Sequence, residues 1–297
     1  MTPKNNQLKS SENSNLWTKK NNTNTLPKSR GRSGNGHDAN PPSVFVPKPP
    51  KSKPKPKPPV VPVAPPPPST SSLTPIILKT IATENPPNFF VLNTVDYTIP
   101  AGSQLTIGAN QTFYLSNNNF VNNGSLQILG SLTVKGGTFI NNGNITTILN
   151  SQFNTGGSSL FTSTLITNKA TMKFGGFFSL GSGSTFTNEK TGTVTTMNTF
   201  YQFEIFNNSG IFNINGNFLL NSGTINNNGS MINSASSTIQ NNNTINNNIY
   251  IENLGTISNN DIINNNNLIY NPGSIINAQG GYITPQSNIV GNQVIQQ

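Results

Sequence analysis

The chain has 297 residues and a formal net charge of +9, yet only 8% of its side chains are charged and it contains no cysteine. Without cysteine there is no disulfide framework, thiolate metal site or cysteine nucleophile. The one histidine, His37, lies in a polar segment near the N-terminus, which argues against most catalytic triads and zinc sites. Residues 1–14 lack the apolar run of a secretory signal, and no stretch approaches the roughly 20 apolar residues of a membrane helix.

Charge and proline divide the sequence at about residue 75. Residues 1–75 hold 12 of the 17 lysines and arginines, two of the eight acids and 17 of the 22 prolines, so their net charge is +10. Residues 76–297 hold five lysines, six acids and 44 asparagines, so their net charge is −1. We therefore predict a disordered basic, proline-rich tail over residues 1–75 and one folded domain over residues 76–297.

The tail sequence predicts a tether. Residues 47–68 combine lysine with proline and favour a solvated polyproline II helix, since proline fixes φ and removes backbone donors. One interpretation is attachment to an anionic polymer or surface, such as nucleic acid or phospholipid. The PxxP spacing also fits a proline-binding protein, and a plain solvated spacer is the third interpretation. The candidate basic contacts are Lys48, Lys51, Lys53, Lys55 and Lys57.

A repeat follows, clearest over residues 100–285. In each copy a large apolar residue is followed two positions later by asparagine, often with a small residue two positions after that, as in Phe120, Asn122 and Gly124. The longest gap between copies contains Gly156, Gly157, Ser158 and Ser159, which we interpret as an insertion. The apolar residues are separated by 19, 27, 20, 20, 19, 20 and 18 positions: Phe120, Phe139, Ile166, Phe186, Phe206, Ile225, Ile245 and Ile263.

The residues within each copy favour strands. Apolar residues alternate with polar ones, as at Leu126 and Ile128 or at Leu132 and Val134, and good helix formers are scarce. A period of about 20 residues, with short strands and corners rich in asparagine and glycine, is typical of a parallel β-helix. We therefore predict an all-β fold, a single-stranded parallel β-helix (a solenoid) with ~20 residues per coil.

The repeated asparagines predict a structural ladder. Asparagine tolerates left-handed backbone angles, so we expect it where the chain bends, with its amide stacked on the asparagine one coil away. Glycine then permits the sharp corner. The predicted ladder residues are Asn122, Asn141, Asn168, Asn188, Asn208, Asn227, Asn247 and Asn265.

Two resemblances follow from these residues. The segment that contains Phe120, Asn122, Gly124 and then Phe139, Asn141, Gly143 resembles the ~20-residue repeats of filamentous-haemagglutinin-type β-helices, in which N-x-G marks a corner. That family is secreted through an N-terminal signal and secretion domain, and neither is found in this sequence. The asparagine runs and the Lys/Pro-rich tail are also similar in composition to structural proteins of mimivirus-like giant viruses.

Many parallel β-helices degrade polysaccharides with clustered carboxylates, so a catalytic pair would require acidic residues at matching positions of adjacent coils. Glu204 and Asp261 have the same offset from their repeats but are three coils apart. At about 4.8 Å per coil this is roughly 14 Å. A pair of glycosidase carboxylates is separated by roughly 5–9.5 Å. The sequence favours a protein without catalytic residues, metal or cofactor.

The sequence therefore predicts a non-enzymatic structural or attachment protein with a rigid body and a basic tether. A virion-associated or surface fibre-like component is the leading context. The alternatives are a cell-surface adhesin or glycan-binding module exported by a non-classical route and, less favoured, a polysaccharide-degrading β-helix enzyme. Self-association is a further expectation, because the ends of a β-helix are unpaired strand edges.

Overall fold

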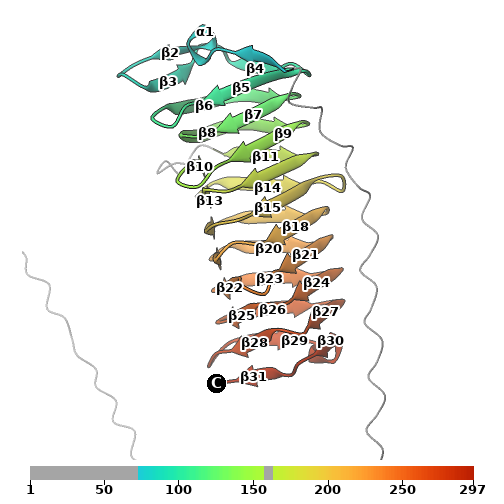
Figure 1. Cartoon of the computed structure of the whole chain (residues 1–297). Helices are drawn as coiled ribbons and strands as arrows, with labels where there is room; N and C mark the ends of the chain where they lie inside the picture. The colour runs from blue at the N-terminus through green and yellow to red at the C-terminus, as the bar shows by residue number, and fades with distance from the viewer. Residues whose placement is uncertain (1–72, 157–162) are drawn as a thin grey trace, which may run out of the picture. The chain divides into compact units, whose positions relative to one another are not determined.

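The computed structural model describes residues 73–156 and 163–297, which form an all-β solenoid of about ten turns (Figure 1). The turns place short strands on three faces, which we name A, B and C. Within each face a strand pairs in parallel with the strands one turn before and one turn after it. The predicted fold class, a parallel β-helix, is confirmed.

Each face is a parallel sheet whose strands follow one another in chain order. Face A contains β1 (Thr74–Ile76), β5 (Ser103–Ile107), β7 (Ser125–Ile128), β9 (Asn144–Thr147), β12 (Thr171–Phe174), β15 (Thr193–Thr196), β18 (Ile211–Ile214), β21 (Ser230–Asn233), β24 (Tyr250–Asn253), β27 (Leu268–Asn271) and β30 (Ile289–Gly291). Face B contains β3 (Phe89–Leu92), β6 (Thr112–Asn122), β8 (Ser131–Asn141), β10 (Gln152–Thr155), β13 (Phe177–Leu180), β16 (Phe200–Gln202), β19 (Phe218–Asn221), β22 (Thr238–Asn241), β25 (Thr256–Asn259), β28 (Ser274–Asn277) and β31 (Val294–Gln296).

Face C contains β4 (Asp96–Ile99), the second halves of β6 and β8, β11 (Thr164–Asn168), β14 (Ser184–Asn188), β17 (Ile205–Asn208), β20 (Thr224–Asn227), β23 (Thr244–Asn247), β26 (Ile262–Asn265) and β29 (Tyr282–Thr284). The 11-residue strands β6 and β8 run round the corner and join faces B and C. A 3₁₀ turn, η2 (Gln286–Asn288), lies between β29 and β30.

Alternation of apolar and polar residues builds the strands. In β7, Leu126 and Ile128 are buried, while Ser125 and Gln127 lie on the outer surface. Successive side chains of a strand point to opposite sides, and turns stack about 4.8 Å apart. The buried residues of all turns therefore form one continuous apolar column along the axis of the solenoid.

The repeat sets the register of face C. Phe120 lies opposite Phe139, Phe139 opposite Ile166, and the remaining repeat residues follow in the same way as far as Ile263. The extra residues of the long gap fall between β10 and β11, because β8 pairs with both strands. Of the predicted insertion, Gly156 is described and residues 157–159 lie outside the described part.

Left-handed backbone angles were expected to explain the asparagines and glycines at the corners of the repeat, but the structure gives a different reason. The described non-glycine residues with positive φ are Asn88, Asn117 and Asn150, and none belongs to the predicted ladder. The corner glycine Gly143 has no positive φ either, but a Cβ at this position would lie 2.1 Å from the carbonyl oxygen of Gly124. At these positions of the repeat, glycine is required by the close approach of neighbouring turns, and asparagine by the hydrogen bonds of its amide.

The N-terminal end of the solenoid has a short cap. It consists of α1 (Leu78–Ile81) and the antiparallel pair of β2 (Ala82–Glu84) with β3. Leu78 and Ala82 are buried in the core. The predicted domain boundary at residue 75 stays a prediction, because the chain before residue 73 lies outside the described part.

Candidate functional site

The eight asparagines predicted from the repeat form one unbroken chain of hydrogen bonds along the corner after face C. The side-chain Nδ2 of each donates to the Oδ1 of the next, beginning with Asn122 to Asn141 at 2.7 Å and ending with Asn247 to Asn265 at 2.8 Å. The five intervening bonds are 2.8–3.0 Å long. All eight side chains are fully buried.

Most of these amides also donate a hydrogen bond to a backbone carbonyl of the next turn. Asn227, for example, donates to the Oδ1 of Asn247 at 3.0 Å and to the carbonyl of Tyr250 at 2.8 Å. Buried polar groups cost free energy unless they are paired, and here each amide joins two turns through side chain and backbone. A row of neutral amides supplies neither a nucleophile nor a general acid or base, so its chemical capacity is structural.

Two further buried ladders were not predicted from the sequence. On face B, Asn221, Asn241, Asn259 and Asn277 are linked in order by bonds of 2.6–2.7 Å. On face A, Asn233 donates to Asn253 and Asn253 to Asn271, at 2.8 and 2.7 Å. The later turns therefore carry a ladder at every corner, whereas the earlier turns carry one.

A signal for these ladders is present in the sequence. From Ile239 to Ile275 isoleucine recurs every six residues, and asparagine recurs every six residues from Asn241 to Asn277. This spacing divides an 18-residue turn into three equivalent strands. The ~20-residue period alone conceals it, because turns containing Ala235, Ser236 or Gly216 are longer.

Asparagines also form rows on the outer surface, in which the side-chain hydrogen bonds run in the opposite direction along the solenoid. Asn226, Asn246 and Asn264 each donate from Nδ2 to the asparagine of the preceding turn, at 2.8 Å. Next to this row, Asn248 donates to Asn228 and Asn266 donates to Asn248, at 2.8 and 2.7 Å. The inner ladders donate toward the C-terminus and these outer rows toward the N-terminus.

Glu204 and Asp261, the two acids with matching repeat offsets, lie far apart. The carbonyl oxygens of Glu204, Gly223, Asn243 and Asp261 accept equivalent backbone hydrogen bonds at the corner before face C, which places Glu204 and Asp261 three turns apart. At about 4.8 Å per turn this is roughly 14 Å. Among the described residues, no group of three or more His, Cys, Asp or Glu side chains could hold a metal ion.

Two side chains have displaced pKa values for evident reasons. Lys79, whose Nζ is 2.8 Å from Glu84, and the backbone N–H of Asn88 lower the pKa of the Glu84 carboxyl. Burial raises the pKa of Tyr250 to about 12, and the charges of Glu252 and Tyr270 add to this shift. Neither shift creates a general acid or base that titrates near neutral pH.

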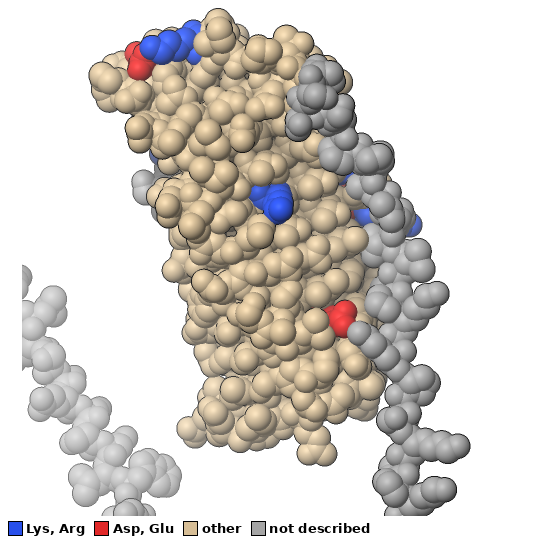
Figure 2. Space-filling model, viewed as in Figure 1, with Lys and Arg blue, Asp and Glu red and all other residues tan. Residues whose placement is uncertain are grey.

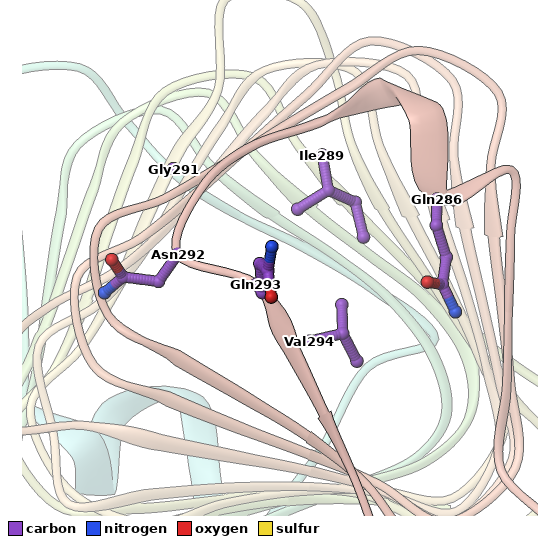
Figure 3. Close-up of a pocket in the computed structure, with 6 residues that line it drawn as sticks. All are labelled: Gln286, Ile289, Gly291, Asn292, Gln293 and Val294. Carbon is purple, nitrogen blue, oxygen red and sulfur yellow. The ribbon is translucent and has the colours of Figure 1, made fainter. Parts of the chain in front are cut away.

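Among the residues that the structure describes, two shallow cavities can be defined. One, of about 290 Å³, is formed by residues of the last turn (Figure 3): Gln286, Ile289, Gly291, Asn292, Gln293 and Val294. Ile289 and Val294 pack against the apolar core. The other, of about 420 Å³, is lined on face A by Gln104, Ser125, Gln127 and Thr146. Neither lining includes a charged side chain.

The predicted basic contacts, Lys48, Lys51, Lys53, Lys55 and Lys57, lie outside the described residues. In the part of the chain that the structure describes, no helix is long and apolar enough to span a membrane. On the view of Figure 2, charged side chains are few and scattered over the solenoid. In the described residues, the features that could carry a function are therefore the amide ladders and the outer faces of the solenoid.

Comparisons of the chain with family models, curated proteins and solved structures found no match.

Proposed function

We propose that this chain is a non-enzymatic structural or attachment protein, in which the β-helix is a stiff body and the basic tail is its tether. The observation that supports this most strongly is the unbroken ladder from Asn122 to Asn265. Its side chains are placed to join turns, at buried positions where each amide needs partners. A virion-associated or surface fibre-like component is the proposed context.

Sequence similarity supports the proposed virion or surface context, but it does not bear on what the protein binds. The corner at Asn122 and Gly124 is similar to corners in filamentous-haemagglutinin-type repeats, and the asparagine-rich composition is similar to giant-virus structural proteins. Mass spectrometry of purified particles and of fractionated cells tests this proposal. Enrichment in particles or in a surface fraction is expected, and recovery only in the soluble fraction would contradict it.

The proposed role of the tail is attachment to an anionic polymer or surface. A full-length variant with Lys48, Lys51, Lys53, Lys55 and Lys57 replaced by glutamine removes five positive charges but keeps every proline. Counterion release predicts that it binds heparin more weakly and with a shallower salt dependence than the parent. Unchanged binding would favour the spacer or the proline-binding alternative, and pull-down with proline-binding domains would separate these two.

The enzyme alternative has a direct test. If Glu204 or Asp261 were catalytic, Glu204→Gln or Asp261→Asn would abolish polysaccharide cleavage by the parent protein. We expect no cleavage by the parent at all, because the two carboxylates lie three turns apart. Cleavage that either substitution removes would contradict the proposed non-enzymatic role.

A further inference from the structure

Face B carries two aromatic pairs with the same diagonal register on its outer surface. Phe89 and Tyr114 have ring centroids 5.7 Å apart, and Phe177 and Tyr201 have ring centroids 5.1 Å apart. In each pair the phenylalanine opens one strand and the tyrosine is diagonal to it in the next turn, as the registers of Val91 with Tyr114 and of Ser179 with Tyr201 require. All four rings are half-buried, so each keeps an accessible surface.

The two pairs lie on the same outward columns, four turns apart. The column of Tyr114 continues through Thr133, Asn154 and Ser179 to Tyr201. Four steps of about 4.8 Å separate the tyrosines by roughly 19 Å along the axis. Of the strands concerned, β3, β6, β8, β10 and β13 follow one another down one side of the solenoid in Figure 1, and β16, which carries Tyr201, pairs with β13.

Hydrogen-bonding side chains fill the space between the aromatic pairs. Ser131 and Gln152 occupy the column of Phe89 and Phe177, beside Thr133 and Asn154. The Nδ2 of Asn154 donates to the Oε1 of Gln152 at 3.2 Å, which orients both amides. We call the two aromatic pairs and these four polar residues the face B strip. None of its residues is charged.

We propose that the face B strip binds an extended, uncharged glycan chain. A pyranose ring has an apolar C–H surface that stacks on the negative face of an aromatic ring, and hydroxyls at its rim that pair with amides and hydroxyls. The strip presents both features in alternation along a straight line. An anionic glycan would need cations along the whole strip, whereas Lys135, the next outward residue of β8 after Thr133, lies at one edge of it. A buried apolar peptide would leave the four central polar groups unpaired.

One neighbouring ring extends this surface. Phe203, which is 45% exposed, lies with its ring parallel to that of Tyr201 and 6.0 Å from it, with an interplanar angle of 1°. The end of the strip at Tyr201 thus presents three aromatic rings, whereas the end at Tyr114 presents two. We therefore expect Tyr201 to contribute more to binding than Tyr114.

The test measures binding of the full-length protein to neutral hexasaccharides by isothermal titration calorimetry. Straight β-1,4-linked glucose and N-acetylglucosamine hexamers are the probes, with the helical α-1,4-linked glucose hexamer as a comparison. We expect at least one β-linked hexamer to bind and Tyr201→Ala to weaken that binding about tenfold, as the loss of one stacking contact predicts. Tyr201→Phe, which keeps the ring, should weaken binding by less than about twofold.

The matched control is Tyr282→Ala, which removes a 59% exposed tyrosine from face C and leaves the strip intact. It should bind as the parent does. Failure of both β-linked hexamers to bind would overturn the proposal, and so would binding that neither Tyr114→Ala nor Tyr201→Ala weakens. The strip is independent of the proposed structural role, since ladder variants test that role through stability and strip variants report only on glycan binding.

Discussion

At the scale of single residues, the molecule depends on pairing buried amides. In the described part, three buried Oδ1 atoms have no hydrogen-bond partner, and they belong to Asn122, Asn221 and Asn233. These are the first members of the three inner ladders, opposite Ile99, Gln202 and Ile214 in the turn before. Each inner ladder therefore leaves one acceptor unpaired at its start. Adding further turns to a ladder adds no further unpaired acceptor of this kind.

Neighbouring asparagines allow burial to be separated from hydrogen bonding. Asn247 donates to the buried inner ladder and Asn248 to the exposed outer row, each with bonds of about 2.8 Å. We expect Asn247→Ala to destabilise the protein by about 3 kcal/mol, because it leaves a buried cavity and orphans the Oδ1 of Asn265. Asn248→Ala should cost at most about 0.5 kcal/mol, since water replaces its partners. Urea denaturation measures both, and equal losses would contradict the role of the inner ladder.

The N-terminal cap contains a residue-scale dependence on pH. The pKa of Glu84 is lowered by Lys79 and by the N–H of Asn88, so its carboxylate stabilises the folded cap above the unfolded-state pKa of about 4.5, and this contribution is lost as pH falls through the lower folded pKa. We predict that Glu84→Gln increases amide hydrogen exchange in β2 and β3 at pH 7. At a pH below the folded pKa the variant and parent should exchange alike. A difference that persists in acid would contradict this ion pair as the cause.

At the scale of elements, each strand is held by the turn before it. The corner glycines allow this approach, since a Cβ on Gly143 would lie 2.1 Å from the carbonyl oxygen of Gly124. Gly280 differs, because a Cβ there would meet nothing within 4 Å but its φ is +95°. The two positions thus separate steric clash from backbone strain.

Substitution by alanine tests this distinction. Gly143→Ala should cost about 3 kcal/mol, because the turns must move apart to admit the methyl group. Gly280→Ala should cost about 1 kcal/mol, the strain of a left-handed residue with a side chain. Chemical denaturation at fixed pH compares the two. A larger loss at Gly280 would show that φ, rather than the distance between turns, determines where glycine is needed.

Face C could be predicted from the sequence because its apolar and asparagine positions recur in nearly every turn. Faces A and B could not be predicted in the same detail, since other residues occupy the equivalent corner positions in earlier turns. These are Thr147 and Thr196 on face A and Thr155 and Leu180 on face B. The face B strip depends on the register between β10 and β13, across the longest gap in the repeat. Phe89 and Phe177 can be assigned to one outward column, four turns apart, only when that register is known.

At the scale of the whole molecule, the solenoid is a stack in which each turn contacts its two neighbours. Its core changes along the axis: phenylalanine is mixed with aliphatic residues as far as Phe212, and isoleucine predominates from Ile239 onward. The later turns also gain the two additional ladders. In a one-dimensional stack, stability is approximately a sum of turns and nearest-neighbour interfaces. A chain of hydrogen bonds adds another possibility, because bonds in series polarise one another and can couple distant turns.

Double-mutant cycles in the inner ladder distinguish these two forms of coupling. Asn227 and Asn247 are bonded directly at 3.0 Å, so their alanine variants should be non-additive by roughly 1 kcal/mol or more. Asn141 and Asn247 belong to the same ladder, but Asn168, Asn188, Asn208 and Asn227 lie between them. If coupling is limited to adjacent turns, this second pair should be additive within about 0.5 kcal/mol by urea denaturation. A larger coupling energy would contradict the nearest-neighbour description and show that the amide chain acts as one cooperative unit over five hydrogen bonds.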